Sequence, residues 1–126
     1  MLRSVLVGNA IFELLRYEFC MRCGGFRRVE RQMRKPARRA MLRGLVPEKE
    51  VMRAMDLALT LYWKRVQCLQ RSVAAARLLR KYGFPAKLII GCRTEPFLSH
   101  AWVEVGDRAV NDSPVYRHTL PVLMQL

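Results

Sequence analysis

The sequence predicts an α+β fold in which helices come first and a small antiparallel sheet follows. Apolar residues recur at helical spacing as far as Tyr82. Beyond that point, short apolar runs are separated by glycine and proline, as in strands joined by tight turns. A chain of 126 residues is long enough for one hydrophobic core. We therefore expect a single domain, 1–126, with a helical, basic N-terminal region (residues 1–66) and a second region (residues 67–126).

Two amphipathic helices are predicted in the first half of the chain. The first spans about Leu2–Met21 and ends at Gly24-Gly25, because glycine adopts the left-handed conformation that terminates helices. The second spans about Pro47–Val66, where proline suits the first turn. Trp63 lies near its end, and we expect it to be a core aromatic residue, with a substrate contact as the alternative.

Basic residues outnumber acidic ones by 23 to 10, which gives a net charge of +13. This charge predicts an acidic partner: nucleic acid, a membrane surface, or an acidic peptide or protein. Many of the basic residues lie in Arg22–Arg43, which Pro36 divides into two predicted short helices. Phe26 is the only aromatic residue of this stretch, and the missing aromatic interleaving argues against nucleic acid. We expect a solvated cationic face or, as the functional alternative, a docking surface for a partner or leader peptide. The arginines of that surface would be Arg27, Arg28, Arg31 and Arg34.

The second half of the chain begins with a helix predicted over Cys68–Tyr82. Gly83 fits the left-handed position that ends a helix, and the following proline prevents continuation. Gly106-Asp107 is a hairpin signal between two later apolar runs. The pattern does not determine the structure of Val115–Leu126. Strands are predicted at Ala86–Gly91, Ser99–Val105 and Arg108–Asp112.

A cysteine, a histidine and an acid follow one another on these elements in an order that suggests chemistry. Cys68 occupies the first turn of its helix, where free backbone N–H groups and the helix dipole place partial positive charge. A thiol there forms the nucleophilic thiolate more readily. His100 and Asp112 come next, on successive strands. Such an order is typical of cysteine nucleophile sites in which an acid orients the histidine.

The register of the last hairpin decides which residue can orient His100. A two-residue turn would pair Val105 with Arg108 and turn Asp112 away from the histidine. A three-residue loop would pair Glu104 with Arg108 and set His100 opposite Asp112. Opposite charges on facing residues favour the longer loop, although turn statistics favour the shorter one. We therefore predict the three-residue loop, with Asp112 as the orienting residue in preference to Asn111, which the shorter turn would place on the same face as His100.

Three stretches of this sequence together resemble a known family. They are Cys68-Leu-Gln-Arg-Ser72, Leu78-Leu-Arg-Lys-Tyr-Gly-Phe-Pro-Ala-Lys-Leu-Ile-Ile-Gly91 and Pro96-Phe-Leu-Ser-His-Ala-Trp-Val-Glu-Val105. The family is the leader peptidases of lasso-peptide biosynthesis, in the transglutaminase-like cysteine-protease superfamily. The likeness runs from about Gln67 to Asp112, and the N-terminal half matches only as a basic helical region. It implies a papain-like core with the nucleophile-bearing helix packed on a small antiparallel sheet, preceded by helices.

The resemblance also implies the chemistry. Cys68 would attack a peptide carbonyl, His100 would take the thiol proton and return it to the leaving amine, and Asp112 would orient the imidazole. The backbone N–H of Cys68 is a natural donor to the oxyanion, because it lies at a helix start. The candidates for a second oxyanion donor or a substrate contact are Gln67, Trp63 and Trp102.

The partners follow from the same resemblance. They are a ribosomally made precursor peptide, a separate leader-binding protein and a separate ATP-dependent lasso cyclase. The winged-helix-like leader-binding domain of some family members is not visible in the sequence, which points to the standalone form of the peptidase. No cofactor or metal is required. Cys20 and Cys23 have the spacing of half a zinc site, but Cys92 and His118 are isolated, which favours ordinary cysteines.

The start of the chain mixes apolar residues with charged ones, so we predict no signal peptide and no membrane insertion. Four cysteines in so helical a chain indicate reduced thiols, and hence a cytoplasmic protein. Two alternatives stay open on the sequence alone. One is a transglutaminase-like acyl transferase with the same reacting residues. The other is a non-enzymatic, basic nucleic-acid-binding module.

Overall fold

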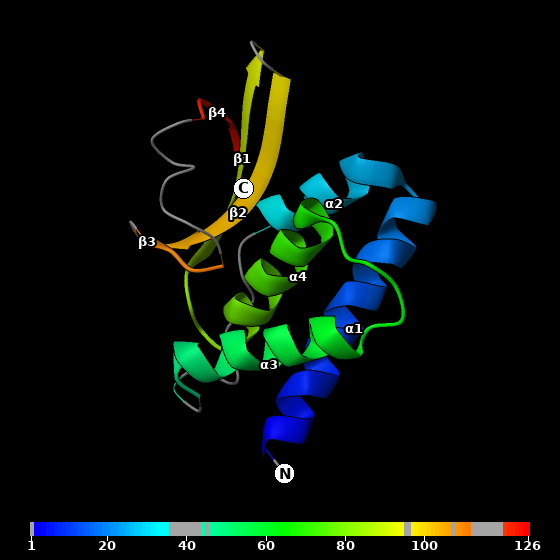
Figure 1. Cartoon of the computed structure of the whole chain (residues 1–126), viewed down its shortest axis with the longest axis vertical. Coiled ribbons are helices and arrows are strands. Elements are labelled where there is room, and N and C mark those ends of the chain that lie inside the picture. Colours follow the sequence, from blue (N-terminus) through cyan, green and yellow to red (C-terminus); the bar gives the residue numbers. More distant parts are fainter. Residues whose placement is uncertain (1, 36–43, 45, 95–96, 107, 112–119) are drawn as a thin grey trace.

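The computed structural model describes residues 2–35, 44, 46–94, 97–106, 108–111 and 120–126, and it confirms the α+β class (Figure 1). Helices come first in the chain, and an antiparallel sheet of four strands follows. The helices are α1 (Leu2–Arg22), α2 (Gly25–Arg34), α3 (Glu48–Leu61) and α4 (Cys68–Lys81). The strands are β1 (Ala86–Thr94), β2 (Phe97–Val105), β3 (Arg108–Ala109) and β4 (Val122–Gln125).

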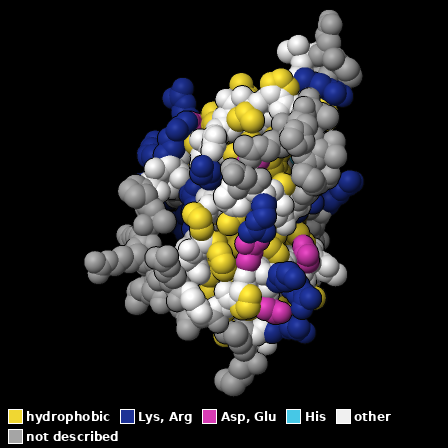
Figure 2. All heavy atoms as spheres, turned by 90° about the vertical axis from the view of Figure 1, so that its left-hand side faces the viewer, with side chains coloured by type: hydrophobic (Ala, Val, Ile, Leu, Met, Phe, Trp, Pro, Cys, Tyr) yellow, Lys and Arg dark blue, Asp and Glu magenta, His cyan; other side chains and the backbone are white. Residues whose placement is uncertain are grey.

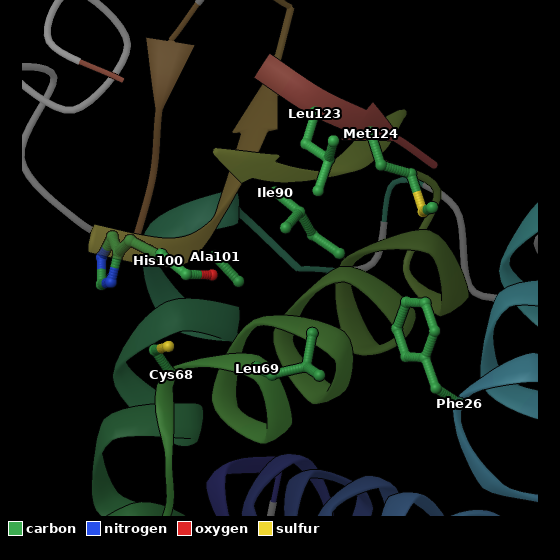
Figure 3. Close-up of a pocket in the computed structure, with 9 residues that line it drawn as sticks. Phe26, Cys68, Leu69, Ile90, His100, Ala101, Leu123 and Met124 are labelled. Atoms are coloured by element: carbon green, nitrogen blue, oxygen red, sulfur yellow. The ribbon is translucent and has the colours of Figure 1, made fainter. Parts of the chain in front are cut away.

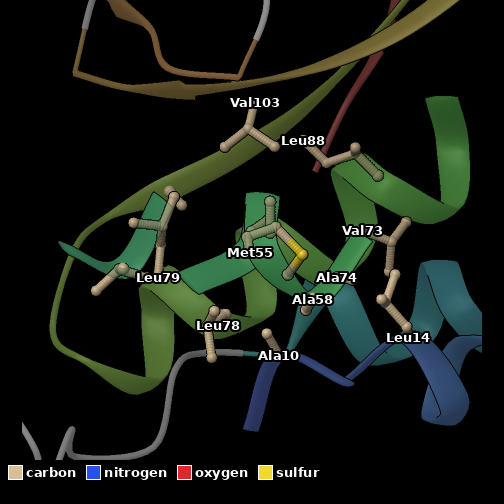
Figure 4. Packing of buried hydrophobic residues seen from close by; sticks show 14 of the residues in the cluster. Ala10, Leu14, Met55, Ala58, Val73, Ala74, Leu78, Leu79, Leu88 and Val103 are labelled. Atoms are coloured by element: carbon tan, nitrogen blue, oxygen red, sulfur yellow. The ribbon is translucent and has the colours of Figure 1, made fainter. Parts of the chain in front are cut away.

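Helix α4 lies at the centre of the molecule. It packs against α1 and α3, and it also contacts β1 and β2, so the sheet and the other helices enclose it (Figure 1). Ten consecutive positions of α4, 70–79, are buried except for two arginines that are half-buried. The side chains that fill the core around it come from every layer (Figure 4). They include Leu14 of α1, Met55 of α3, Leu78 and Leu79 of α4, Leu88 of β1 and Val103 of β2.

The sheet has the strand order β3-β2-β1-β4, and its described pairs are antiparallel. Along β2, one set of alternate side chains, Ala101, Val103 and Val105, belongs to the core that contains α4. The other set includes Trp102, which packs on the opposite face with Ile89 of β1. Strand β4, which the sequence pattern did not determine, covers the free side of β1, and its neighbour Leu120 packs on Trp102.

Helix α4 ends as the sequence predicts. Gly83 has a φ of 93°, in the left-handed region. Its N–H donates to the Arg80 carbonyl at 3.1 Å, and the N–H of Phe84 donates to the Leu79 carbonyl at 3.0 Å. These two bonds form a Schellman motif, which satisfies carbonyls that the helix leaves without partners.

Helix α3 ends earlier than the sequence pattern predicts, at Leu61 and not near Val66. A tertiary contact explains the difference. The Tyr62 hydroxyl donates to the Glu18 carboxylate of α1 at 2.7 Å, and Lys64 forms an ion pair with the same carboxylate. Together these contacts hold the segment 62–67 against α1 in a non-helical path that leads to the start of α4.

The predicted three-residue hairpin loop is wrong. Val105 pairs with Arg108, which leaves a two-residue turn that begins at Gly106, with a φ of 63°. In this register Glu104 lies opposite Ala109 and Arg108 lies opposite Val105, so the expected facing pair of Glu104 and Arg108 does not form. Glu104 is buried and accepts a hydrogen bond from the Trp102 indole at 2.9 Å, whereas Arg108 forms an ion pair with Glu48 of α3 at 3.0 Å.

Basic side chains are not confined to α2. Lys and Arg side chains are spread over the face shown in Figure 2, with hydrophobic side chains between them and the acidic groups close to basic ones. This distribution agrees with the net charge of +13. Within the described residues, none of the helices has the length and hydropathy needed to cross a membrane.

Arg80 of α4 joins three separate regions of the fold. Its guanidinium donates to the carbonyls of Ala86 at 2.8 Å, Met33 at 2.9 Å and Leu126 at 2.6 Å. One side chain therefore connects the start of β1, the end of α2 and the residue after β4. A guanidinium can make these three bonds at once because its donors form a rigid fork.

We expect Arg80→Met to lower the free energy of unfolding by about 3 kcal/mol, because three carbonyls lose a charged donor. Arg80→Lys should restore only some of the loss, since an ammonium keeps the charge but not the fork. Urea unfolding followed by circular dichroism measures both. The matched control is Arg53→Met: Arg53 is exposed and pairs only with Glu50 among the described contacts, so its loss should change stability by less than about 0.5 kcal/mol. Equal effects at both positions would contradict the assignment.

Candidate active site

A pocket of about 280 Å³ lies where the start of α4 meets the sheet. Cys68 and His100 both line it, and Figure 3 shows them at the same end of the pocket. The rest of the wall is largely apolar and comes from α2, α4 and three strands. These lining residues are Phe26, Leu69, Ile90, Ser99, Ala101, Leu123 and Met124. The fold thus brings together two of the three residues that the sequence suggests for catalysis.

Cys68 is the first residue of α4, as predicted, and its side chain is half-buried. The preceding residue, Gln67, is extended, and its side chain makes no capping hydrogen bond. The first helical bond of α4 runs from the Arg71 N–H to the Gln67 carbonyl at 3.0 Å. The N–H groups of residues 68–70 precede it and have no acceptor within the helix. They supply hydrogen-bond donors and partial positive charge beside the thiol.

The first turn of α4 is fixed to α1. The Gln70 side-chain amide donates to the Leu14 carbonyl at 3.1 Å, and this contact is buried. One turn further along α1 lies Tyr17. Burial raises the pKa of Tyr17, and the charge of Cys68 raises it further. The phenol therefore stays protonated near the thiol and remains a hydrogen-bond donor. Sequence reasoning missed Tyr17, because it lies on a helix far from Cys68 in the chain.

Trp63 is not the core residue that the sequence predicts. Its side chain is 68% exposed, and its ring lies 4.4 Å from that of Tyr62 at a tilt of 36°. Because α3 ends before it, Trp63 leaves the helical face that would have buried it. Neither Trp63 nor the exposed Gln67 is among the residues that line the pocket. Their roles as a substrate contact or second oxyanion donor remain predictions.

His100 lies on β2, opposite Gly91 of β1, and is half-buried. Its ring lies 6.2 Å from that of Trp102, with an angle of 24° between the ring planes. Trp102 is fully buried, and its indole N–H donates to the carboxylate of Glu104 at 2.9 Å. Its role as a substrate contact or oxyanion donor remains a prediction. Its place beside the imidazole suits a residue that holds His100 in position.

Ser72 joins the two elements that carry Cys68 and His100. Its hydroxyl is fully buried and donates to the Ala101 carbonyl of β2 at 3.0 Å. The Asn111 side chain completes the network: its amide donates to Ser72 Oγ at 3.1 Å, and its oxygen accepts from the Val103 N–H at 2.8 Å. Asn111 is thus engaged with α4 and β2. Sequence reasoning missed this network; the signal that could have revealed it is a polar residue one turn after Cys68, within an apolar stripe.

Asp112, the predicted orienting residue, lies outside the described residues. The prediction for Asp112 rested on the three-residue loop, which the structure contradicts. Among the described residues, the pairing of β2 with β3 ends at Ala109. Asp112 therefore remains a prediction that is supported by its position in the chain after His100.

All four cysteines are free. Cys20 is buried, and its thiol donates to the Gln32 side chain at 3.4 Å, whereas Cys23 is exposed. Among the described residues, no group of three or more potential ligands is placed to hold a metal ion. His118, the remaining candidate ligand, lies outside them.

The four arginines predicted to serve docking lie on α2. Arg27, Arg31 and Arg34 are exposed, and Arg34 forms an ion pair with Glu30 at 3.0 Å. Arg28 is half-buried and lies over the Phe19 ring, 5.5 Å from its centroid. Their contribution to docking remains a prediction.

We expect Gly91→Ala to disturb His100 through Trp102. A methyl group at Gly91 would lie 2.9 Å from Leu120 Cβ and 3.0 Å from two carbon atoms of the Trp102 ring. Such overpacking costs about 1–3 kcal/mol of unfolding free energy and displaces the indole beside His100. The measurements are urea unfolding and the NMR chemical shifts of the His100 ring. Gly8→Ala is the control: it has no neighbouring atom within 4 Å and lies within a helix, so it should stabilise the protein by up to about 1 kcal/mol. Unchanged His100 shifts in Gly91→Ala would contradict the role given to Trp102.

Comparison with known proteins agrees with this geometry. Residues 13–125 match the family model of the transglutaminase-like superfamily. Over 59 residues, the chain is 46% identical to the microcin J25-processing protein McjB of Escherichia coli. That stretch makes up 47% of this chain but only 28% of McjB, so the similarity spans a minor portion of the relative. No solved structure matches the chain. Because the family model covers most of its length, the chain belongs to the transglutaminase-like superfamily.

Proposed function

We propose that this chain is a cysteine peptidase that removes the leader from a ribosomally made lasso-peptide precursor. The observation that carries the proposal is the shared pocket of Cys68, at the start of α4, and His100, on β2. Membership of the transglutaminase-like superfamily supports it. So does the similarity to a protein named for processing microcin J25, which gives a peptide as the substrate class.

In the proposed reaction, the Cys68 sulfur attacks the carbonyl carbon of the peptide bond between leader and core. His100 accepts the thiol proton and then gives it to the departing amine, which leaves the leader bound as a thioester. Water adds to the thioester, again with His100 as base, and releases the leader carboxylate and the free thiol. Asp112 orients the imidazole and stabilises its charged form.

The start of α4 contributes to the same step. The N–H of Cys68 has no acceptor within the helix and is available to the oxygen that becomes negatively charged. Gln67 and Trp63 stay the candidates for a second donor. The apolar wall of the pocket would hold an uncharged segment of the precursor beside the thiol and exclude water from it. A separate leader-binding protein and an ATP-dependent lasso cyclase would act with the peptidase in the cytoplasm.

We expect Cys68→Ala to abolish precursor cleavage, by about a thousandfold or more, because no other group supplies the nucleophile. The fold should survive, since the lost sulfur costs on the order of 1 kcal/mol of stability. Mass spectrometry of a synthetic precursor peptide measures cleavage, and circular dichroism verifies folding. Cys23→Ala is the control, because this exposed thiol lies outside the pocket and should leave cleavage intact. Cleavage by a folded Cys68→Ala protein would exclude the mechanism.

The same assay distinguishes the remaining alternatives. Alkylation of the thiol should stop cleavage, and a chelator should not. If a chelator stops cleavage and added zinc restores it, the protein is a metal enzyme. Transfer of the leader to an added amine, in place of its release as a carboxylate, would identify an acyl transferase. Absence of any thiol-dependent reaction together with steeply salt-dependent binding of DNA or RNA would favour the nucleic-acid-binding module.

The proposed roles of Asp112 and Asn111 can be distinguished by measuring both the catalytic rate and the stability of their alanine variants. We expect Asp112→Ala to lower kcat/KM by about 10²–10⁴-fold with little change in unfolding, since its proposed task is to orient His100. Asn111→Ala should instead lower the free energy of unfolding by about 1–3 kcal/mol, because the Val103 N–H loses its acceptor and the buried Ser72 Oγ loses the donor of one of its two hydrogen bonds. Steady-state kinetics and urea unfolding of both variants test this. The reverse result would assign the orienting role to Asn111.

A further inference from the structure

Helix α1 has a second apolar face, turned away from the core. Its inner face packs on α3 and α4, as expected of an amphipathic helix. Yet large hydrophobic side chains are also exposed along the other side, at spacings of 7, 3 and 4 residues, so they share one helical face. These residues, here called the α1 ridge, are Val5, Phe12, Leu15 and Phe19, which are 57%, 53%, 42% and 59% exposed.

The charged groups beside the ridge are positive. The Lys81 ammonium lies over the Phe12 ring at 5.7 Å, and the Arg28 guanidinium lies over the Phe19 ring at 5.5 Å. The exposed row of α2, Arg27, Arg31 and Arg34, continues the positive charge from Arg28.

The acidic groups of α1 are turned inward and neutralised. Glu13 is 3% exposed and is held by Arg77 at 3.1 Å. Glu18 accepts the Tyr62 hydroxyl and forms an ion pair with Lys64. An apolar strip flanked by the cations Arg28 and Lys81 is complementary to a strip of apolar residues flanked by acidic ones.

The shape of the ridge favours a protein over a lipid surface. The Phe12 and Phe19 rings are 53% and 59% exposed, and each has a cation beside it, so a helix with acidic side chains next to its apolar ones could pair with both features. Gly8 lies between Val5 and Phe12, is exposed, and has no atom within 4 Å of the place of a Cβ. This gap can receive a side chain from a facing helix, as in knobs-into-holes packing.

We propose that the α1 ridge is the docking site for an acidic amphipathic helix of a partner protein. The ridge extends over four turns, about 21 Å at 1.5 Å per residue, which matches a partner helix of about 14 residues. Apolar side chains of the partner contact Phe12, Leu15 and Phe19, and its acidic side chains meet Arg28 and Lys81. This surface lies on α1 and is separate from the residues that line the Cys68 pocket, so the inference stands whether or not the chain cleaves a precursor.

The test uses a fluorescent synthetic peptide of about 18 residues with a Leu/Phe face flanked by glutamates, and the whole chain as its receptor. A second peptide has lysines in place of the glutamates. We expect fluorescence anisotropy to show binding of the acidic peptide only, with NMR shifts centred on Val5, Phe12, Leu15 and Phe19. Affinity should fall with added salt, as charge complementarity requires.

The double variant Phe12→Gln/Phe19→Gln should weaken binding by about tenfold or more. Both side chains are exposed, so the fold should tolerate the change, which circular dichroism verifies. Leu57→Gln/Leu61→Gln is the matched control: it removes two exposed hydrophobic residues from α3 and should leave affinity unchanged.

Four results would overturn the inference. Equal weakening by both double variants, or equal binding of both peptides, would show nonspecific hydrophobic contact. Binding only to vesicles that contain phosphatidylglycerol would assign the ridge to a membrane surface. A dimer in sedimentation experiments that Phe12→Gln/Phe19→Gln dissociates, with no peptide binding, would show that a second copy of this chain covers the ridge.

Discussion

The position of α4 between the other helices and the sheet is the constraint on which the rest of this structure depends. Its buried side chains form the middle of the core, so its ends cannot move independently of β1 and β2. One hydrogen bond inside that interface has a particular consequence. The Ser72 hydroxyl, one turn after Cys68, is bonded to the Ala101 carbonyl, which adjoins His100. The thiol and the imidazole therefore come to one pocket because the core itself aligns the elements that carry them.

Both sides of the pocket are supported by buried polar groups. The thiol side depends on α1: Gln70 binds the Leu14 carbonyl, and Glu18 binds the segment that leads to Cys68. On the imidazole side, Trp102 fills the space above Gly91, and Glu104 holds its indole. Substitutions in these supports should change the positions of Cys68 and His100 in the pocket. The N-terminal helices thus support the pocket that contains Cys68 and His100, and they also carry basic side chains.

The same packing determines which charged side chains lie inside the protein and which lie on its surface. Acidic residues of α1 are used internally, where Glu13 and Glu18 neutralise Arg77 and Lys64. Many of the remaining cations lie outside, beside apolar groups. A basic exterior favours association with acidic partners, whatever their sequence, because long-range attraction raises the rate of encounter. The apolar ridge of α1 adds a surface on which such an encounter can become specific.

The sequence by itself determined the fold class, the helix that begins at Cys68, its stop at Gly83, and the strand that carries His100. These features are local: apolar periodicity, a helix-ending glycine and short apolar runs depend on neighbouring residues. Tertiary structure decided what depends on contacts between distant residues. The contact of Tyr62 with Glu18 ends α3 early and leaves Trp63 exposed. The predicted register paired Glu104 with Arg108, but Arg108 binds Glu48 and Glu104 binds the Trp102 indole. A local sequence pattern cannot predict these contacts, because they form between residues that come together only when the helices and the sheet pack.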